Sequence, residues 1–237
     1  MPLLTSLTRE VRVCLGGSPI KGSLPVTNSW VGGPSGPGLS FPLRFRVTVG
    51  RAIDPLTGYI EDIAALDRLI RQALRPWGES VAPLARVEAW LPDLFGRLTK
   101  SVTDHEAPNL RIERLEVQLS PEWSFAVFQE QPHVVRVTRQ YEFSAAHRLH
   151  SSQLSEAENR RVFGKCNNVY GHGHNYLLDV SIEGVPQAES QMVLLDGEFD
   201  RIVKERAVQR LDHRFLNLEL PEFRELNPTV ENIAQTI

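Results

Sequence analysis

An internal repeat restricts the possible folds of this chain more than any other feature of its sequence. Three alternating apolar residues in one segment match three in a later segment at a constant offset of 133 residues: Phe45, Val47, Val49 and Leu178, Val180, Ile182. The same offset aligns residues 66–70 with residues 199–203 without a gap. Strand, loop and helix patterns follow in the same order in both places, so we interpret the similarity as a tandem duplication.

The hydropathy pattern predicts strands followed by helices in each half. Apolar and polar residues alternate over residues 135–145 and 176–182, which is typical of half-buried strands. Helical periodicity follows over residues 62–74 in the first half and 199–211 in the second.

A second helix is expected in each half, at about residues 87–98, where Pro92 would kink or shorten it, and from Pro228 onward. The first half then continues into two more strand patterns, residues 110–118 and 123–128. The second half has no room for such strands, because the chain ends inside its second expected helix.

These patterns predict an α+β fold with antiparallel sheets and helices on one face. We expect one domain over residues 1–130 and another over residues 131–237, the second lacking its last two strands. Either the sequence is a fragment or another chain supplies the missing pairing. Residues 16–38 are rich in glycine and proline and are expected to form a loop.

Composition excludes several classes of protein. Hydrophobic residues make up 41% of the chain and charged residues 23%, as in ordinary globular domains. The net charge of −3 argues against nucleic-acid binding, and no apolar run approaches the roughly 18 residues of a membrane span. Only two cysteines occur, so we do not expect a disulfide framework. Because no secretory signal is visible either, we expect the protein to lie in the cytoplasm.

The histidines indicate a metal site, because five of the seven fall within one stretch of 67 residues. His172 and His174 share one face of a strand. His147 ends the preceding strand pattern with inward parity, so it can lie opposite this pair if the two strands are antiparallel. Three neutral imidazoles with one open position form a catalytic zinc arrangement, although other late first-row ions also accept three histidines.

Two alternatives to a catalytic metal centre stay open for these histidines. A single histidine on an apolar strand is more often a hydrogen-bonded core residue, and a His-x-His pair alone is weak evidence for a metal. A closed structural site is the second alternative, since Cys166 with three histidines would complete a tetrahedral zinc site.

Cys166 lies in a polar loop beside the histidines, where Lys165 and a nearby metal would favour its thiolate. We therefore predict that it is a reactive base or nucleophile rather than an inert buried cysteine. Asp212 and His213 follow a helix, and a carboxylate beside an imidazole can tune it for proton transfer, although such pairs are common by chance. His150 is interpreted as a surface residue.

Together these segments resemble the 6-pyruvoyltetrahydropterin synthase family over residues 134–237. The resemblance rests on motifs in matching order: Phe143-Ser-Ala-Ala-His-Arg-Leu149, Asn159 to Val162, Phe163-Gly-Lys-Cys-Asn-Asn168, Gly171-His-Gly-His-Asn-Tyr176, Leu211-Asp-His213, Leu216-Asn217 and Pro228-Thr-Val-Glu-Asn232. The family is built on the tunnelling fold, a ββααββ unit whose sheets form barrels across subunits. The resemblance implies tandem tunnelling-fold units here, the first degenerate and without a metal site.

The resemblance also implies roles for individual residues. The family's three histidines bind Zn²⁺, and they match His147, His172 and His174. The cysteine matching Cys166 is catalytic and is not a ligand. The family's pair that matches Asp212 and His213 forms a proton relay, which a neighbouring subunit often supplies. The family's residue that matches Glu231 lies near the pterin pocket.

The implied activity is that of a zinc-dependent carbon–oxygen lyase. It would convert 7,8-dihydroneopterin triphosphate to 6-pyruvoyltetrahydropterin with loss of triphosphate, in a homo-oligomer with active sites at subunit interfaces. A 6-carboxytetrahydropterin synthase of queuosine biosynthesis is an alternative, although the five residues between Cys166 and His172 are more similar to the pyruvoyl type. The remaining alternative is a non-catalytic, metal-stabilised scaffold that binds pterins.

The first half keeps none of the metal set. At the offset of 133, the residues facing His147, Cys166, His172 and His174 are Cys14, Gly33, Leu39 and Phe41. We expect this half to be structural and to supply sheet edges for barrel closure or assembly.

Overall fold

The computed structural model describes residues 4–15, 41–80, 86–104 and 109–237. Six strands follow one another in the sheet in the order β1-β2-β3-β4-β5-β6, and β7 pairs with β5. The chain forms two compact units: residues 1–139 with 181–194, and residues 140–180 with 195–237. Two strands are shared between the units, β5 (Gln131–His147) and β6 (His172–Gly184). The beginning of β5 and the end of β6 belong to the first unit, and the rest of both strands belongs to the second.

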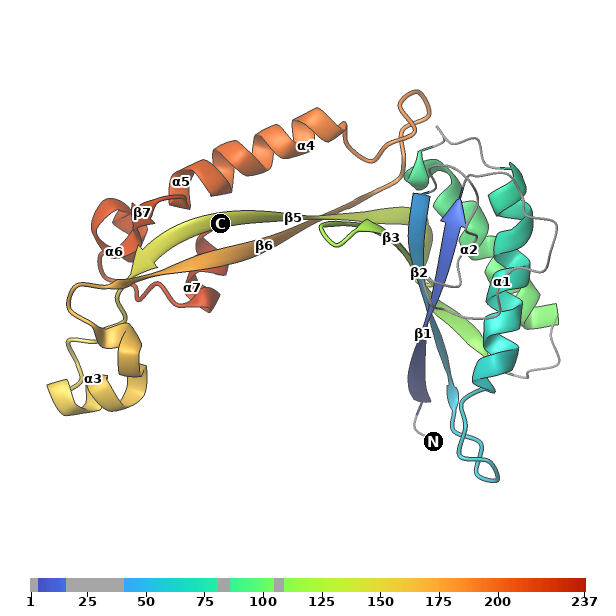
Figure 1. Cartoon of the computed structure of the whole chain (residues 1–237), viewed down its shortest axis with the longest axis horizontal. Coiled ribbons are helices and arrows are strands. Elements are labelled where there is room, and N and C mark those ends of the chain that lie inside the picture. Colours follow the sequence, from blue (N-terminus) through green and yellow to red (C-terminus); the bar gives the residue numbers. More distant parts are fainter. Residues whose placement is uncertain (1–3, 16–40, 81–85, 105–108) are drawn as a thin grey trace. The chain divides into compact units, whose positions relative to one another are not determined.

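The first unit has the element order ββααββ (Figure 1). Its elements are β1 (Leu4–Leu15), β2 (Phe41–Ala52), α1 (Ile63–Ser80), α2 (Val87–Asp104), β3 (Arg111–Ser120) and β4 (Trp123–Phe128). Neighbouring strands are antiparallel. Apolar residues of β2 alternate with polar ones and are fully buried at Phe45, Val47 and Val49. They form a core with Leu66 and Ile70 of α1, so the helices cover one face of the sheet.

The other face of this sheet carries charged residues in place of an apolar core. Glu10 on β1 forms ion pairs with Arg12, Arg44 and Arg46. Glu116 on β3 pairs with Arg46 at 3.2 Å and with Arg114. These side chains extend from three adjacent strands, and such cross-strand pairs stabilise a sheet face that none of the described helices covers.

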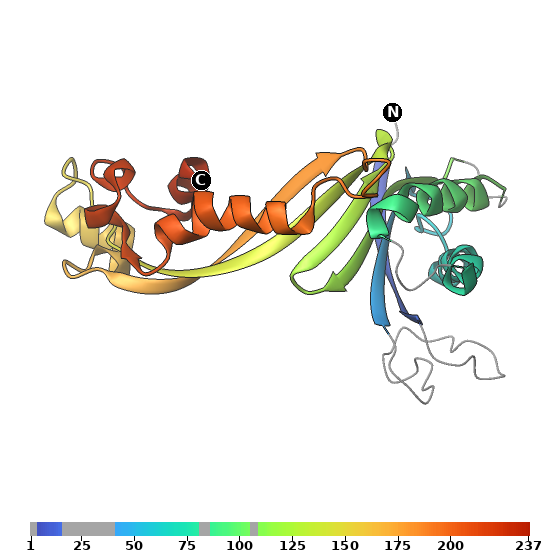
Figure 2. The same ribbon diagram turned by 90° about the horizontal axis from the view of Figure 1, so that it is seen from above.

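The second unit begins within β5 and continues through shorter elements, the group from α4 to α7 lying along β5 and β6 (Figure 2). They are α3 (Glu156–Phe163), the 3₁₀ turn η1 (Gly164–Asn167), α4 (Asp196–Val203), the π-helical turn η2 (Lys204–Val208), α5 (Gln209–Leu211), β7 (Arg214–Phe215), α6 (Leu216–Glu219), η3 (Pro221–Phe223) and α7 (Val230–Thr236).

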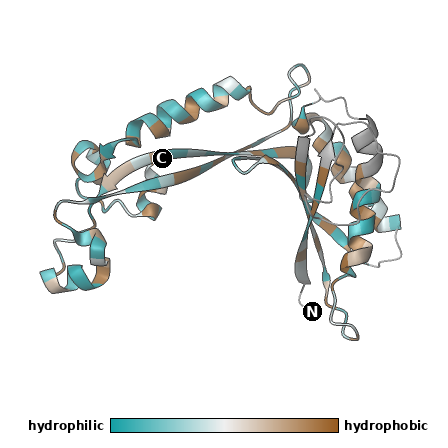
Figure 3. Ribbon diagram, viewed as in Figure 1, coloured by the Kyte–Doolittle hydropathy of each residue, from teal (hydrophilic) through white to brown (hydrophobic). Residues whose placement is uncertain are grey.

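The core of the second unit joins β5 to the later helices. Its buried residues are Phe143, Ala145, Leu211, Leu216, Leu220, Phe223 and Ile233. Hydrophobic and hydrophilic residues alternate along α4 (Figure 3), where Phe199 and Val203 are buried. This amphipathic pattern places α4 on the same face of the sheet as Phe143, since Phe199 contacts the ring of Tyr141.

The predicted α+β class, with an antiparallel sheet and helices, is confirmed. Two helices are longer than expected: the helix expected over residues 62–74 extends to Ser80, and the helix expected over residues 87–98, which Pro92 was to kink or shorten, continues to Asp104. Residues 16–38, the predicted loop, lie outside the described residues. The division into residues 1–130 and 131–237 stays a prediction. No helix in the described ranges combines the length and apolarity needed to cross a bilayer.

Candidate metal centre

Strands β5 and β6 set the register that brings the histidines together. In the second unit Gln140 donates to Asp179 at 2.8 Å, and the Ser144 hydroxyl donates to Asn175 at 2.8 Å. These pairs follow an antiparallel register that, when continued, puts His147 opposite His172. The register therefore explains why residues far apart in sequence meet at this end of the strands.

The three predicted histidines do form one cluster of rings. The ring centroids of His147 and His172 are 4.8 Å apart, those of His147 and His174 are 5.0 Å apart, and those of His172 and His174 are 4.5 Å apart. The group best placed to share an ion is slightly different, because the ligand atoms of His147, Cys166 and His172 all lie within 4.8 Å of one another. His174 is more exposed than the other two.

Two buried ring nitrogens show that a cation fits this group. The Nδ1 atom of His147 lies 2.7 Å from the carbonyl oxygen of Pro228, so this nitrogen carries the proton and donates, which leaves a lone pair on Nε2. His147 Nε2 and His172 Nδ1 are both buried without a hydrogen-bond partner. Orphaned nitrogens of this kind are costly unless something binds them, and imidazole nitrogens are donors that suit zinc.

Electrostatics favours the neutral imidazoles that a metal requires. Burial lowers the pKa of His147, and the neighbouring His172 and His174 lower it further, against the opposing effect of the Pro228 carbonyl. Burial and the nearby His174 lower the pKa of His172. Because protonated imidazole cannot coordinate a cation, both shifts extend toward lower pH the range in which these imidazoles are neutral and able to bind a metal ion.

The loop that carries Cys166 is fixed against the end of β5. Helix α3 ends at Phe163, and its C-cap Gly164 has a φ of 55° that glycine adopts at little cost. The turn η1 then carries Cys166. The Leu149 amide donates to the Cys166 carbonyl at 2.8 Å. These contacts hold the thiol beside the histidines, as the sequence predicted.

A polar network, which sequence reasoning missed, supports that loop. The side-chain oxygen of Asn167, which is 8% exposed, lies 3.0 Å from His150 Nδ1 and accepts from Arg148 at 3.4 Å. The interpretation of His150 as a surface residue was therefore wrong, since it is half-buried in this network. Asn217 bonds both the amide and the carbonyl of Arg148, at 2.7 and 3.0 Å.

The Asp212–His213 pair forms, but outside the metal group. His213 Nδ1 lies 2.8 Å from Asp212 Oδ2, and the Ser144 amide donates to Asp212 at 2.9 Å. These bonds from Ser144 and His213 lower the pKa of Asp212, which keeps it a carboxylate. The His213 side chain is 82% exposed and borders an open depression with His174 and Asn175.

Glu231 occupies the first turn of α7, whose N-cap is Thr229. Its own amide and the Thr229 hydroxyl lower the pKa of this exposed carboxylate. The same turn follows Pro228, the residue whose carbonyl binds His147. Glu231 is thus positioned by the segment that also fixes a histidine of the metal group.

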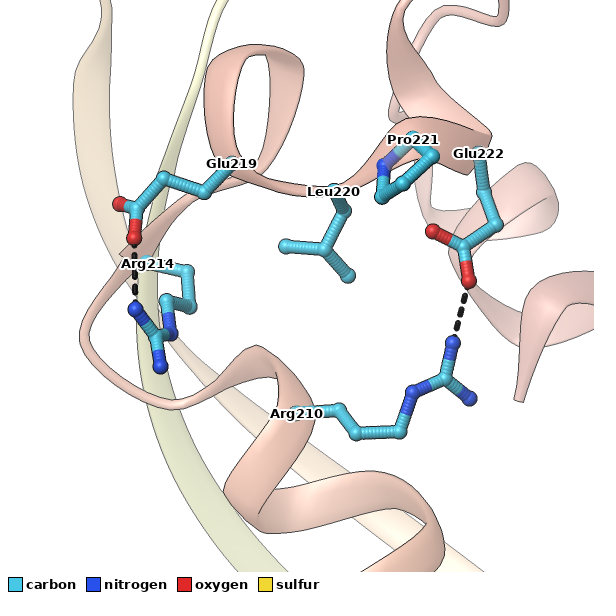
Figure 4. Close-up of a pocket in the computed structure, with 6 residues that line it drawn as sticks. All are labelled: Arg210, Arg214, Glu219, Leu220, Pro221 and Glu222. Atoms are coloured by element: carbon cyan, nitrogen blue, oxygen red, sulfur yellow. Dashed lines mark hydrogen bonds and ion pairs between the residues drawn. The ribbon is translucent and has the colours of Figure 1, made fainter.

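A separate hollow lies near α5, α6 and η3 (Figure 4). Ion pairs join Arg210 to Glu222 and Arg214 to Glu219 on its two sides, and Leu220 lies between them. None of the predicted site residues lines it. It carries no arrangement of nucleophile, base and ligand, so we assign the chemistry to the histidine group.

Comparison with known proteins identifies the second unit. A family model described as 6-pyruvoyl tetrahydropterin synthase matches residues 136–237. The 6-pyruvoyl tetrahydrobiopterin synthase of Homo sapiens is 41% identical over 99 residues, which are 42% of this chain and 68% of that protein. The Dictyostelium discoideum protein of the same name is 41% identical over 100 residues, covering 73% of its length. The chain belongs to the 6-pyruvoyl tetrahydropterin synthase family.

Membership of this family covers less than half of the chain. The Drosophila melanogaster 6-pyruvoyl tetrahydrobiopterin synthase is 45% identical over 105 residues. The matched segment is 44% of this chain, and the chain spans 62% of that relative's length. The solved Caenorhabditis elegans 6-pyruvoyl tetrahydropterin synthase is 41% identical, with a TM-score of 0.41, over 43% of this chain and 72% of that one. Every predicted site residue lies inside the segment that the family model matches.

Proposed function

We propose that this protein is a zinc-dependent lyase that converts 7,8-dihydroneopterin triphosphate to 6-pyruvoyltetrahydropterin and releases triphosphate. The observation that carries the proposal is the pair of buried, unpartnered ring nitrogens on His147 and His172, with the thiol of Cys166 beside them. An inert core would bury apolar groups there, because unpaired polar atoms destabilise a fold.

The residues would divide the work as follows. His147, His172 and His174 would hold the ion, and Cys166 would stay beside it as a base. When bound, zinc supplies Lewis-acid chemistry toward the hydroxyls of the substrate side chain and so makes the neighbouring C–H groups more acidic. Cys166 would take up and return the proton from that carbon, since a thiolate in reach is a competent base.

Asp212 and His213 would complete the proton relay, with Asp212 orienting the imidazole. His213 is largely exposed and does not belong to the metal group of its own unit. This exposure supports a homo-oligomer in which the pair serves the site of a neighbouring copy. Glu231, kept ionised on the first turn of α7, would bind the pterin ring through its carboxylate.

For residues 1–130 we propose a degenerate tunnelling-fold unit with a structural role. Its element order is ββααββ, and its uncovered sheet face is held by ion pairs among Glu10, Glu116 and their arginines. No group of metal ligands lies within its described residues. We also expect the protein to act in the cytoplasm.

Product analysis tests the proposed activity. The zinc-loaded full chain is incubated with dihydroneopterin triphosphate, and the pterins are identified by mass spectrometry. We expect 6-pyruvoyltetrahydropterin together with one triphosphate per turnover. A 6-carboxy product would instead assign the chain to the queuosine-type activity, and no consumption with zinc bound would favour a non-catalytic scaffold.

A further inference from the structure

The loop between β2 and α1 (Figure 1) contains a turn that its own hydrogen bonds hold in place. The amide of Asp54 donates to the carbonyl of Tyr59 at 2.9 Å, and the amide of Gly58 donates to the carbonyl of Asp54 at 2.8 Å. The Asp54 side chain also accepts from the amides of Leu56 and Thr57, at 2.7 and 3.2 Å. Because these bonds already fix the backbone, the turn would lose little conformational entropy on binding a partner.

The loop between β6 and α4 contains the same turn at the offset of 133 residues. The amide of Gln187 donates to the carbonyl of Met192 at 2.9 Å, and the amide of Gln191 donates to the carbonyl of Gln187 at 2.8 Å. Gln191 has a positive φ of 58°, as Gly58 has at the equivalent position with 74°. Met192 is therefore the counterpart of Tyr59.

The two turns differ in how much of them is covered. Met192 belongs to a segment of the first compact unit, Ser181–Leu194, and is only 4% exposed. Tyr59, in contrast, is 64% exposed. Leu56 of the same turn is 94% exposed, and its counterpart in the second turn is Glu189. The first turn thus presents apolar side chains to solvent at positions where the second turn is buried or charged.

Four large apolar side chains are exposed on and beside the first turn, and we call them the turn patch: Ile53, Leu56, Tyr59 and Ile63. Apolar residues that are exposed singly are ordinary on protein surfaces, whereas a group of them on one short loop is typical of an interaction surface. Their transfer out of water is the main favourable contribution to protein association. The turn patch therefore indicates a site where another macromolecule docks.

The repeat indicates which partner covers the turn patch. Met192 is buried within the unit that contains the first half of the chain. By the same relation, the surface that fits Tyr59 belongs to a unit built on the second half. Since Tyr59 is largely exposed within its own chain, a second copy of this chain is the partner that presents such a surface.

We propose that the turn patch docks on the second unit of another copy of this chain. The patch and the surface that receives it are different, so the contact is head-to-tail, and repeated contacts of this kind close into a ring when the rotation allows it. This inference rests on the homo-oligomer of the proposed function, for which it supplies the surface. It does not depend on the lyase activity, and its test measures assembly.

The test is the double variant Leu56→Ser, Tyr59→Ser of the full chain. Sedimentation equilibrium measures the association of the wild type and the variant, and circular dichroism checks the fold. We expect an oligomeric wild type and a dissociation constant that is about 30-fold or more higher in the variant, as for truncated hot-spot residues of an interface. Both side chains are exposed in the single chain, so their replacement should leave its fold intact.

The matched control is the double variant Val185→Ser, Leu195→Ser, which changes two exposed apolar residues on either side of the second turn. Its dissociation constant should equal that of the wild type. A monomeric wild type would overturn the proposal, as would an unchanged dissociation constant in Leu56→Ser, Tyr59→Ser. Equal weakening in the control would overturn it as well, because assembly would then not depend on the turn patch in particular.

Photo-crosslinking identifies the surface that receives the patch. A benzophenone amino acid replaces Tyr59, and mass spectrometry of the crosslinked dimer identifies the peptide that it reaches. Peptides from residues 140–180 or 195–237, which form the second unit, are expected; peptides from residues 1–139 would overturn the head-to-tail contact. Turnover of dihydroneopterin triphosphate is measured separately, so a chain that assembles through the patch without consuming substrate would refute the lyase assignment alone.

Discussion

The two units of this protein use the two faces of a sheet for different purposes. In the first unit the inward residues of β2 are apolar and fully buried, including Phe45 and Val47, and the charged residues pair with one another on the uncovered face. In the second unit the inward positions of β5 and β6 carry His147 and His172, whose buried nitrogens lack partners. Ion-paired charges stabilise a sheet face, whereas unpartnered imidazole nitrogens that are buried together beside a thiol suit a metal ion.

The comparison predicts that side chains of the second unit control zinc and turnover, while those of the first control stability. Cys166→Ala should give the largest effect, a loss of turnover of about a thousandfold or more, because it removes the proposed base. Bound zinc should stay at one ion per chain. Zinc is measured by atomic absorption and turnover by pterin analysis, with Cys14→Ala of β1 as the control that should retain both.

Loss of zinc from Cys166→Ala would contradict this division of roles. It would mean that Cys166 is the fourth ligand of a closed structural site, the alternative that the sequence left open. Its membership of the group formed with His147 and His172 makes this the decisive measurement on the metal centre.

His147→Ala should give the next largest effect. Removing partners that merely orient metal ligands lowers affinity by about 10- to 100-fold, so removal of a proposed direct ligand should lower zinc affinity by more than about a hundredfold. Competition with a chromogenic chelator measures the affinity, and circular dichroism checks the fold. His133→Ala, at an exposed position in the first unit, should bind zinc as the wild type does; equal losses in both variants would refute the assignment.

The sequence predicted the strand residues of this centre but not its loop residues. Alternating hydropathy placed His172 and His174 on one face, and antiparallel pairing brought His147 to them, because a strand repeats every two residues. The network of Arg148, His150 and Asn167 follows no period. Its bonds depend on loop conformation, so no pattern in the sequence could reveal that His150 is drawn inward.

The proposed repeat agrees with the burial pattern in one strand and disagrees with it in another. At the offset of 133, the buried Phe45 and Val47 of β2 correspond to Leu178 and Val180, which share the inward parity of Tyr176. Buried Val11 of β1 would correspond to Ser144, which has the opposite parity to Phe143 and Ala145. If the halves are a repeat, the offset changes by one residue between its first and second strands, because a one-residue shift exchanges the two faces of a strand.

Glu116→Gln tests the other side of the comparison. Glu116 is 6% exposed and pairs with Arg46 and Arg114, so losing its charge weakens two charge-assisted bonds. We expect the free energy of unfolding to fall by about 1–3 kcal/mol, with zinc content and kcat unchanged. Urea denaturation measures the first quantity, provided that the transition is two-state.

The matched control for that change is Glu183→Gln on β6, whose pair with Arg136 is exposed. Exposed pairs contribute about 0.2–1 kcal/mol, so the control should be destabilised less. If Glu116→Gln reduced turnover without changing stability, the ion pairs of the first unit would have a role in the reaction. That result would refute the prediction that side chains of the first unit control stability alone.

The smallest effect expected concerns the support of the Cys166 loop rather than the reacting groups. Asn167→Ala removes the acceptor for His150 and Arg148 and leaves part-buried donors without it. The thiol should then shift slightly, and because small misplacements of reacting groups cost rate, we expect kcat to fall by about tenfold with zinc retained. Asn167→Asp keeps the acceptor oxygen and should restore most of the rate, since Arg148 can balance the new charge.

Asn168→Ala separates a positioning effect from a general loss of loop structure. Asn168 is the next residue along, but its side chain is exposed and accepts only from the Tyr170 amide at 3.1 Å among the described contacts. Its kcat should therefore stay within about twofold of wild type, as for surface changes that leave no buried group unpaired. If Asn168→Ala were as slow as Asn167→Ala, the rate would depend on loop order in general, and the network around Asn167 would have no specific part in aiming the thiol.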